Sequence, residues 1–459
     1  MNSVVTSHRS SSAHSRDAQS VRGAAIAVMG LLLALLTSGL VSATPASAAT
    51  KVEFWHTFGD AKRSGWIADR AADYNKLHPD TEVVPVFKGD SNQVLQATIL
   101  SARQGNPPAL VQVEGVSSQL AADSGVFKPV GNVSKVSFSD YLDPVISYYT
   151  INGKVNSIPF NSSSPVLYFN KTLMAKAGLD PTKPPSTFAE IFATCATFDA
   201  AKTGVKCVAL TPFSWLFEQW MSEQNVAMVN NNNGRKGRAT ASNIDSPAGR
   251  RVFSFYQNLN KRGYLTNTGK LADTVGTNAI FTGQKAMMTI NSTAGLGNIL
   301  DASKQSGFEL GVGPLPLPDA KSHNGVVIGG ASLWVAKDVS QSDAELAVDF
   351  GQFLTNTENM VSWHKLTGYY PVRKSSVDNL EKEGWFVSNP LQVVAFKQLL
   401  STTPNVANAG ALNGANIEVR GFIEQGMQKV LDGQNVASVA KTAAAQAKKA
   451  MAEYNKNFG

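Results

Sequence analysis

The feature that most restricts the fold of this chain is a regular alternation of strand-like and helix-like segments near its start. Five segments predict strand, helix, strand, helix and strand in this order: residues 51–55, 61–77, 81–87, 92–103 and 109–113. This order and spacing predict a parallel sheet with crossover helices. In such sheets ligands bind beyond the carboxyl ends of the strands. We therefore expect functional residues at the three strand tips: His56-Thr57, Gly89-Asp90-Ser91 and Glu114-Gly115.

The α/β pattern then continues less regularly. Residues 158–160 and 166–169 predict short strands around a polar turn at 161–164, and residues 187–201 predict a helix. Two further buried strands are expected at 281–290 and 327–335, and the chain from residue 343 onward is mostly helical. Short strands that leave one α/β block, enter another and return indicate two lobes joined by several crossings.

The first 48 residues have the pattern of an export signal. Arg22 precedes an apolar run at residues 23–36, and Ala46-Ser47-Ala48 follows as an A-x-A cleavage site. We expect a signal peptide at 1–48, with an uncleaved membrane anchor as the alternative. No cysteine ends the apolar run, so the usual bacterial lipid attachment site is missing. The mature protein, 49–459, is expected to be exported to the periplasm or the extracellular space.

The charge of the chain argues against a nucleic-acid partner. Removing residues 1–48 takes away three arginines and one aspartate, which lowers the formal net charge from +7 to +5. The remaining basic residues are scattered, whereas nucleic-acid binders concentrate them on one stripe.

The chain has two cysteines, Cys195 and Cys207. In an oxidising compartment a local disulfide bond fits their spacing of 12 residues, and two buried free thiols fit equally well.

No catalytic or metal-binding motif is present in the sequence. The four histidines after residue 48 are not at metal-ligand spacing, and no nucleophile, zinc, phosphate-loop or dinucleotide motif occurs. We therefore expect no cofactor, no metal and no enzymatic activity. The alternative from another class is an exported glycoside hydrolase or phosphodiesterase, which would use two carboxylates that meet across a cleft.

Several motifs carry a resemblance to a known family. They are Phe54-Trp55-His56 and the stretches 159–170, 177–181, 328–335 and 363–371. Together they resemble the extracellular solute-binding proteins of ABC transporters, and they are most similar to the sn-glycerol-3-phosphate-binding subgroup.

The resemblance implies a two-lobed α/β periplasmic binding protein of type II, like the maltose-binding protein, with several hinge crossings. Lobe 1 would comprise about 49–162 and 290–332, and lobe 2 about 163–289 and 333–459. The expected function is capture of sn-glycerol-3-phosphate or a related glycerophosphodiester and its delivery to the transmembrane subunits of an ABC permease. The expected state is a monomer, and a sugar or oligosaccharide is the alternative solute.

The resemblance also implies ligand-contact positions, carried over residue by residue. They are Ser91, Glu114, Ser163, Trp215, Asn291, Ser292, Gly330, Tyr369 and Arg420. A second tryptophan of the family pocket is absent here, and Pro212 or Phe213 is nearest to its position.

Two positions depart from the subgroup pattern. Ser91 stands where the subgroup has a tyrosine, and Gly115 follows Glu114 where the subgroup has Tyr-Glu. The smaller side chains are expected to enlarge the pocket. Glu114 either accepts a ligand hydroxyl or caps the helix near Val116. Arg420 suits a phosphate group because its planar fork donates paired hydrogen bonds to an oxyanion, with a structural salt bridge as the alternative.

Overall fold

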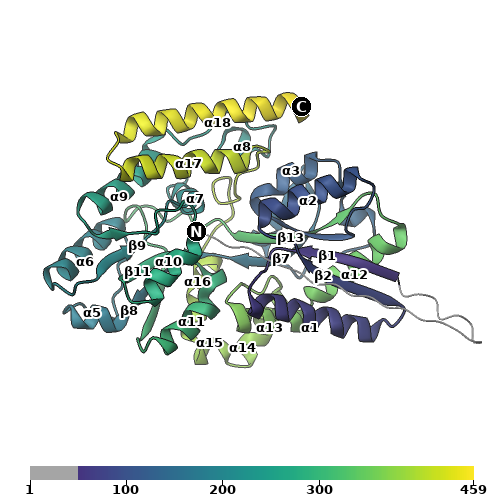
Figure 1. Cartoon of the computed structure of the whole chain (residues 1–459), viewed down its shortest axis with the longest axis horizontal. Helices are drawn as coiled ribbons and strands as arrows, with labels where there is room; N and C mark the ends of the chain where they lie inside the picture. Colours follow the sequence, from purple (N-terminus) through teal and green to yellow (C-terminus); the bar gives the residue numbers. More distant parts are fainter. Residues whose placement is uncertain (1–49, 459) are drawn as a thin grey trace, which may run out of the picture. The chain divides into compact units, whose positions relative to one another are not determined.

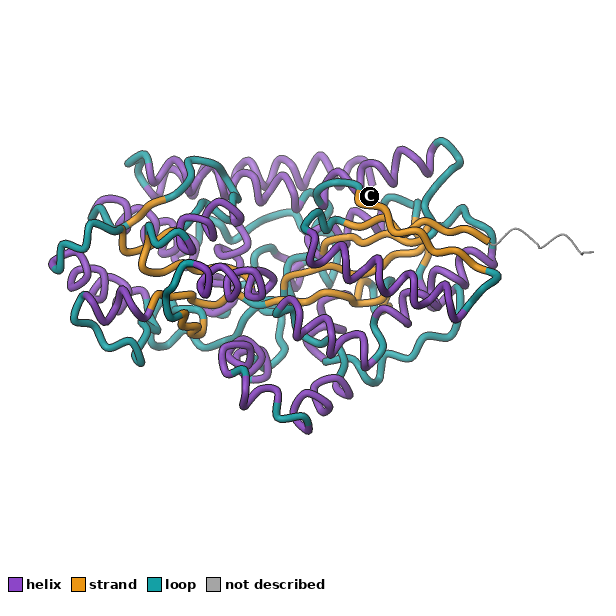
Figure 2. Tube along the Cα trace, turned by 60° about the horizontal axis from the view of Figure 1, so that its bottom comes forward, coloured by secondary structure: helices purple, strands orange, loops and turns teal. Residues whose placement is uncertain are grey.

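The computed structural model describes residues 50–458, so the expected signal peptide at 1–48 lies outside the described residues. These residues contain two larger β-sheets, each covered by helices (Figures 1 and 2). None of the helices in residues 50–458 is long and apolar enough to cross a membrane.

The first sheet begins with the α/β segment expected from the sequence. Its first elements are β1 (Thr50–His56), α1 (Ala61–Leu77), β2 (Thr81–Phe87), α2 (Ser91–Arg103) and β3 (Leu110–Glu114). β1 pairs in parallel with both β2 and β3, which confirms the predicted parallel arrangement. The sheet is completed by antiparallel pairing of β13 (Gly329–Ala336) with β3, β4 (Phe127–Lys128) and β7 (Ile158–Ser163).

The second sheet has the order β10-β9-β11-β8-β12. Its strands are β8 (Pro165–Asn170), β9 (Lys206–Ala209), β10 (Leu265–Thr266), β11 (Ala286–Ser292) and β12 (Leu310–Pro314). The helices of this half include α5 (Lys171–Lys176), α6 (Phe188–Ala200), α7 (Ser214–Glu223), α9 (Pro247–Lys261), α10 (Thr274–Thr282) and α11 (Leu296–Gln305). A disulfide bond joins Cys195 of α6 to Cys207 of β9, with Cα atoms 5.5 Å apart. Of the two alternatives for the cysteines, the structure therefore has the disulfide.

The C-terminal part is helical, as expected. Its helices are α12 (Gln341–Leu354), α13 (Thr357–Thr367), α14 (Lys374–Lys382), α15 (Trp385–Ser388), α16 (Pro390–Leu400), α17 (Asn416–Leu431) and α18 (Val436–Phe458). α12 packs on the first sheet and α13 on α1, whereas α16 packs on β8 and β12. α17 and α18 pack on α9 and run along the top of Figure 1.

Two strand predictions need correction. Asn161–Ser163 belong to β7, so only Ser164 separates β7 from β8 where a four-residue turn was expected. The expected strand at 281–290 is in part helix, because α10 continues to Thr282 and β11 begins at Ala286. Both errors arise because short runs of buried polar or apolar residues have no clear periodicity.

The pairing of strands also differs from the expected lobe limits. β12, at 310–314, lies in the second sheet, although 290–332 was assigned to lobe 1. Residues 333–336 of β13 lie in the first sheet, although they were assigned to lobe 2. We therefore propose to divide the lobes by their sheets, with crossings at Ser164, at 315–328 and between α14 and α16.

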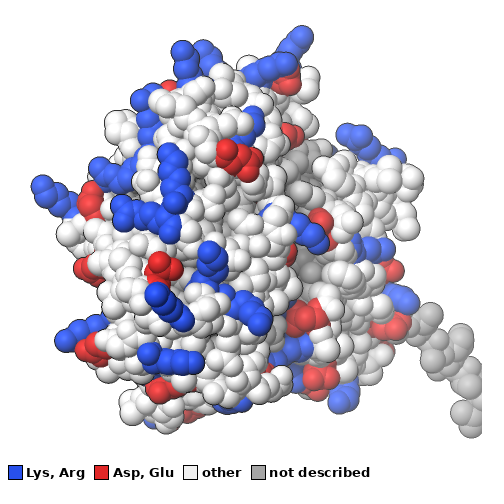
Figure 3. Space-filling model, turned by 60° about the vertical axis from the view of Figure 1, so that its left-hand side comes forward, with Lys and Arg blue, Asp and Glu red and all other residues white. Residues whose placement is uncertain are grey.

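The surface shown in Figure 3 carries Lys and Arg spread among Asp and Glu rather than in one stripe.

Candidate ligand-binding site

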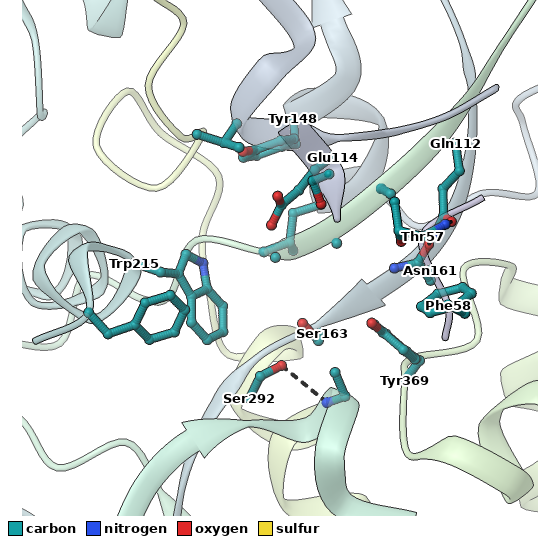
Figure 4. Close-up of a pocket in the computed structure, with 18 of the residues that line it drawn as sticks. Thr57, Phe58, Gln112, Glu114, Tyr148, Asn161, Ser163, Trp215, Ser292 and Tyr369 are labelled. Atoms are coloured by element: carbon teal, nitrogen blue, oxygen red, sulfur yellow. Dashed lines mark hydrogen bonds between the residues drawn. The ribbon is translucent and has the colours of Figure 1, made fainter. Parts of the chain in front are cut away.

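A cavity of about 180 Å³ lies where carboxyl ends of strands from both sheets meet (Figure 4). Eight of the nine ligand-contact positions expected from the sequence line it: Ser91, Glu114, Ser163, Trp215, Ser292, Gly330, Tyr369 and Arg420. Asn291 is the exception. Its side-chain amide donates to the carbonyl oxygen of Thr274 at 3.2 Å and to Oδ1 of Asn278 at 2.8 Å, away from the cavity. Contact of the eight residues with a ligand stays a prediction.

The first-sheet side of the cavity contains a polar network that the sequence did not indicate. Nε2 of Gln112 donates to Oδ1 of Asn161 at 2.8 Å, and Oε1 of Gln112 accepts from the backbone N–H of Thr57 at 2.9 Å. Gln112 and Asn161 are 1% and 2% exposed. Because Oδ1 of Asn161 is held by Gln112, its Nδ2 is left as a donor beside the cavity. Thr57 lies at a strand tip singled out by the sequence, but nothing marked the pairing of Gln112 with Asn161.

Glu114 directs its carboxylate into the cavity (Figure 4). It is the residue before the short 3-10 helix Gly115–Ser117, and its side chain makes no capping hydrogen bond to that helix. The capping alternative is therefore wrong. The carboxylate is the only acidic group among the described residues that line this cavity.

Gly115 does not enlarge the cavity as expected. A Cβ atom at this position would lie 2.4 Å from Cε1 of Tyr148, so the ring of Tyr148 occupies the place of the missing side chain. Tyr148 belongs to α4 (Asp143–Tyr149) and lines the cavity. The small residue thus admits an aromatic ring from another element, which a single sequence does not reveal.

Aromatic rings form two walls of the cavity. Trp215 comes from the first turn of α7, and the ring of Phe213 lies 5.9 Å from it. Of the two residues nearest to the second tryptophan position, Phe213 lines the cavity and Pro212 does not. On the opposite side, Tyr369 stacks on Trp363 with ring centroids 5.5 Å apart, and its hydroxyl points toward Ser163 (Figure 4).

Gly330 has a backbone that only glycine adopts readily. Its φ is +123°, and a Cβ atom would lie 1.8 Å from the carbonyl oxygen of Asn161. At Gly329 a Cβ atom would lie 2.8 Å from Cζ2 of Trp215. The two glycines therefore allow β13 to lie close to both β7 and the indole of Trp215.

Serine hydroxyls add donors on both sides of the cavity. Oγ of Ser292 accepts from the backbone N–H of Ala294 at 3.1 Å, which leaves its own hydrogen available to a ligand (Figure 4). Ser163 ends β7, and Ser91 begins α2, whose N-terminus faces the cavity. The carboxylate of Asp90 caps this helix, because its Oδ1 accepts from the N–H groups of Asn92 and Gln93, both at 2.9 Å. The partial positive charge of this N-terminus is therefore already compensated.

Arg420 is the only cationic group among the described residues that line the cavity, and it is already paired. Its guanidinium donates to Oε2 of Glu218, whose side chain is 4% exposed and whose Oε1 accepts from the N–H of Ala411 at 2.9 Å. Burial opposes the charge on Arg420, but the nearby carboxylates, Glu218 first, raise its pKa. The salt bridge that was expected as the alternative role of Arg420 is thus present, and Arg420 also lines the cavity.

Within residues 50–458, no group of three or more His, Cys, Asp or Glu side chains is placed to hold a metal ion.

Comparison with known proteins places the chain in a family. The model of the family described as bacterial extracellular solute-binding protein matches residues 69–391. The sn-glycerol-3-phosphate-binding periplasmic protein UgpB of Pectobacterium atrosepticum is 33% identical over 444 residues, 94% of this chain and 96% of the relative. UgpB of Salmonella typhimurium is 31% identical over 90% of this chain and 93% of the relative.

Solved structures agree with this fold. UgpB from Mycobacterium tuberculosis in complex with glycerophosphocholine has a TM-score of 0.71 at 22% identity, covering 88% of this chain and 100% of that one. The maltotriose binding protein of Thermus thermophilus has a TM-score of 0.70 at 21% identity, covering 87% and 99%. The two-lobed, maltose-binding-protein-like fold is confirmed, and the chain belongs to the bacterial extracellular solute-binding protein family.

Proposed function

We propose that this protein is the exported substrate-binding component of an ABC importer, and that its solute is a glycerophosphodiester. Export is supported by the periplasmic relatives and by the signal pattern of residues 1–48. Closure of the two lobes around the solute would present the complex to the transmembrane subunits of the permease. We further propose that the receptor acts as a monomer.

The choice of a phosphodiester as the solute rests on the charge of the cavity. One arginine, Arg420, faces the cavity, and it is balanced by Glu218 behind it and by Glu114 beside it. A phosphate monoester such as sn-glycerol-3-phosphate carries about −1.5 to −2 charges at pH 7. A phosphodiester carries a single negative charge, which matches one compensated arginine better.

The same cavity provides for a positive end of the solute. Glu114 supplies a carboxylate, and Trp215, Phe213 and Tyr148 supply aromatic surfaces. Aromatic faces attract quaternary ammonium groups, with roughly 0.5–2 kcal/mol for each contact. The fold neighbour from Mycobacterium tuberculosis was solved with glycerophosphocholine, a ligand that combines a phosphodiester with such a group.

A sugar is the second candidate solute. Trp215 and Tyr369 face the cavity from opposite sides, and Glu114 with the Gln112–Asn161 pair offers hydrogen-bond partners for hydroxyl groups. The cavity of about 180 Å³ is below the roughly 300–1,000 Å³ usual for larger ligands. This size favours a small solute over an oligosaccharide.

A hydrolase is the less supported alternative. Glycoside hydrolases need two carboxyl groups on either side of the scissile bond. Glu114 is the only carboxylate among the described cavity-lining residues. We therefore propose binding without turnover.

Calorimetry on the mature protein tests the proposal with glycerophosphocholine, sn-glycerol-3-phosphate and maltotriose. We expect glycerophosphocholine to bind at least tenfold more tightly than sn-glycerol-3-phosphate. Glu114→Gln should reduce this preference, whereas Glu82→Gln on the exposed face of β2 should leave it unchanged. If maltotriose binds and neither phosphate compound does, the solute is a sugar. Release of free choline or glycerol-3-phosphate would show that the protein is an enzyme.

A further inference from the structure

Glu223, the last residue of α7, is a buried carboxylate that the ligand site does not use. It is 5% exposed, and its Oε2 accepts from the backbone N–H of Gly325 at 3.0 Å. Among residues 50–458 no other hydrogen bond and no ion pair to this carboxylate is present. Buried carboxylates are normally paired with a cation, because burial without a partner disfavours the charged form. Burial accordingly raises the pKa of Glu223 to about 7.

Glu223 lines a cavity of about 850 Å³, which we call the hinge cavity. Its apolar lining includes Leu315 and Leu317 from the crossing between β12 and β13, and Val393 and Val394 from α16. Polar and charged side chains share the lining, among them Glu190, His323, Lys397 and Gln398. The hinge cavity shares no residue with the ligand cavity. It therefore combines a group of leucine and valine side chains with the buried, incompletely paired carboxylate of Glu223.

We propose that the hinge cavity is a second binding site, for a small organic ammonium ion. Its positive group would pair with the free carboxylate oxygen of Glu223, and its hydrocarbon part would lie against the leucine and valine side chains. Such a ligand satisfies both features of the cavity, since a neutral molecule leaves the carboxylate unpaired and a metal ion leaves the apolar walls unused.

The contacts around this site connect it to the ligand cavity. From α7, Oγ of Ser222 donates to the carbonyl oxygen of Gly325 at 2.6 Å, and Gln219 makes two hydrogen bonds to the backbone of Val327. The same crossing continues into Ile328–Gly330, which line the ligand cavity. From α16, Gln398 bonds both Ser164, at another crossing, and the N–H of Leu315. An ion held among these elements would bias the hinge, and the coupling between the two sites must be reciprocal.

The first experiment measures thermal stabilisation of the mature protein by n-butylammonium chloride, with n-butanol and sodium chloride as controls. We expect an ammonium-specific rise of the midpoint, and at least tenfold weaker binding to Glu223→Gln. This variant keeps a carbonyl oxygen for the N–H of Gly325, so its fold should be preserved. Glu309→Gln, an exposed carboxylate on the same lobe, should bind like the unmodified protein. Absence of an ammonium-specific shift, or an equal shift in Glu223→Gln, would overturn the proposal.

A second variant separates this site from the proposed solute site. If n-butylammonium bound the aromatic ligand cavity instead, Glu114→Gln would abolish the shift and Glu223→Gln would keep it, which would refute the hinge site. The outcome does not depend on which solute the ligand cavity binds.

The pH dependence gives an independent readout. The shift should grow between pH 5.5 and 8 as Glu223 ionises, and it should be flat in Glu223→Gln. Three other charged or titratable groups line the hinge cavity: Glu190 of α6, His323 of the crossing and Lys397 of α16. Glu223 also lines a second cavity, with His323, Lys321 and the paired Arg251 and Asp319. A pH dependence that persists in Glu223→Gln would assign it to one of these and count against the proposal.

Discussion

Arg420 both faces the ligand cavity and pairs with buried Glu218, so its two roles need to be separated by mutation. We consider Arg420→Gln, Glu218→Gln and the double variant as a cycle. Arg420→Gln leaves the carboxylate of Glu218 buried, with its side chain 4% exposed. Among the described residues, the N–H of Ala411 is then its remaining partner. The double variant removes both charges and leaves two neutral amides.

The two roles predict different magnitudes. Removing one partner of a buried ion pair destabilises a protein by about 3–5 kcal/mol, because the other charge stays buried. Arg420→Gln should therefore lose about this much stability, and the double variant should regain most of it. A hydrogen bond to a charged group contributes roughly 1.5–3 kcal/mol, so loss of the arginine should weaken binding of a phosphodiester by roughly 10- to 150-fold.

Urea unfolding measures the first effect, and calorimetry with glycerophosphocholine measures the second. If Arg420 binds the solute, the double variant is stable but binds weakly. If the double variant regains both stability and the affinity of the unmodified protein, Arg420 is a structural residue, and the assignment of the phosphate to it is refuted.

Three further predictions concern the stability of the fold. Gly330→Ala should destabilise the protein by at least about 2 kcal/mol and abolish solute binding, since its Cβ would meet the carbonyl oxygen of Asn161. Denaturant unfolding measures the stability and calorimetry the binding, and a variant of normal stability that binds the solute would contradict the prediction. Burial lowers the pKa of His364 to about 4, so the stability that the neutral side chain contributes is present above pH 6.5 and is lost as the pH falls toward 4. We expect this contribution to be about 3 kcal/mol, measured as the pH-dependent difference in unfolding free energy between the unmodified protein and His364→Gln. A difference that does not change with pH would exclude this contribution. Reduction of the Cys195–Cys207 disulfide, which closes a 12-residue separation, should cost about 2–3 kcal/mol in urea unfolding, and an unchanged midpoint in reductant would show that the bond does not stabilise the native state.

Local periodicity was sufficient for the parallel strands and helices that begin the first sheet. The bounds of α1 and β2 agree with the sequence prediction because a helix with one apolar face and a strand before a polar tip both have clear patterns. The strand tips also located Thr57, Ser91 and Glu114 at the cavity, since parallel strands bring their carboxyl ends to one edge. The family resemblance added positions distant in sequence, such as Tyr369 and Arg420.

The rest depends on contacts that no local pattern encodes. Tyr148 fills the space left by Gly115, and Gln112 holds Asn161 across 49 residues. Asn291 sits at a motif position but turns its amide to α10. Each of these is decided by packing between elements that are brought together only in the folded chain.

Charge compensation shows why such contacts matter for specificity. The residues that face the cavity include one arginine and several hydroxyl donors, a set that suits a phosphate monoester and a diester alike. The difference between the two solutes is close to one unit of charge, so it is decided by the carboxylates around the donors. Glu218 lies behind Arg420, and Glu424 accepts hydrogen bonds from Ser214 at the start of α7. Because these carboxylates lower the net positive charge around the cavity without being among its lining residues, a relative with the same contact residues but neutral residues at these two positions should prefer the dianion.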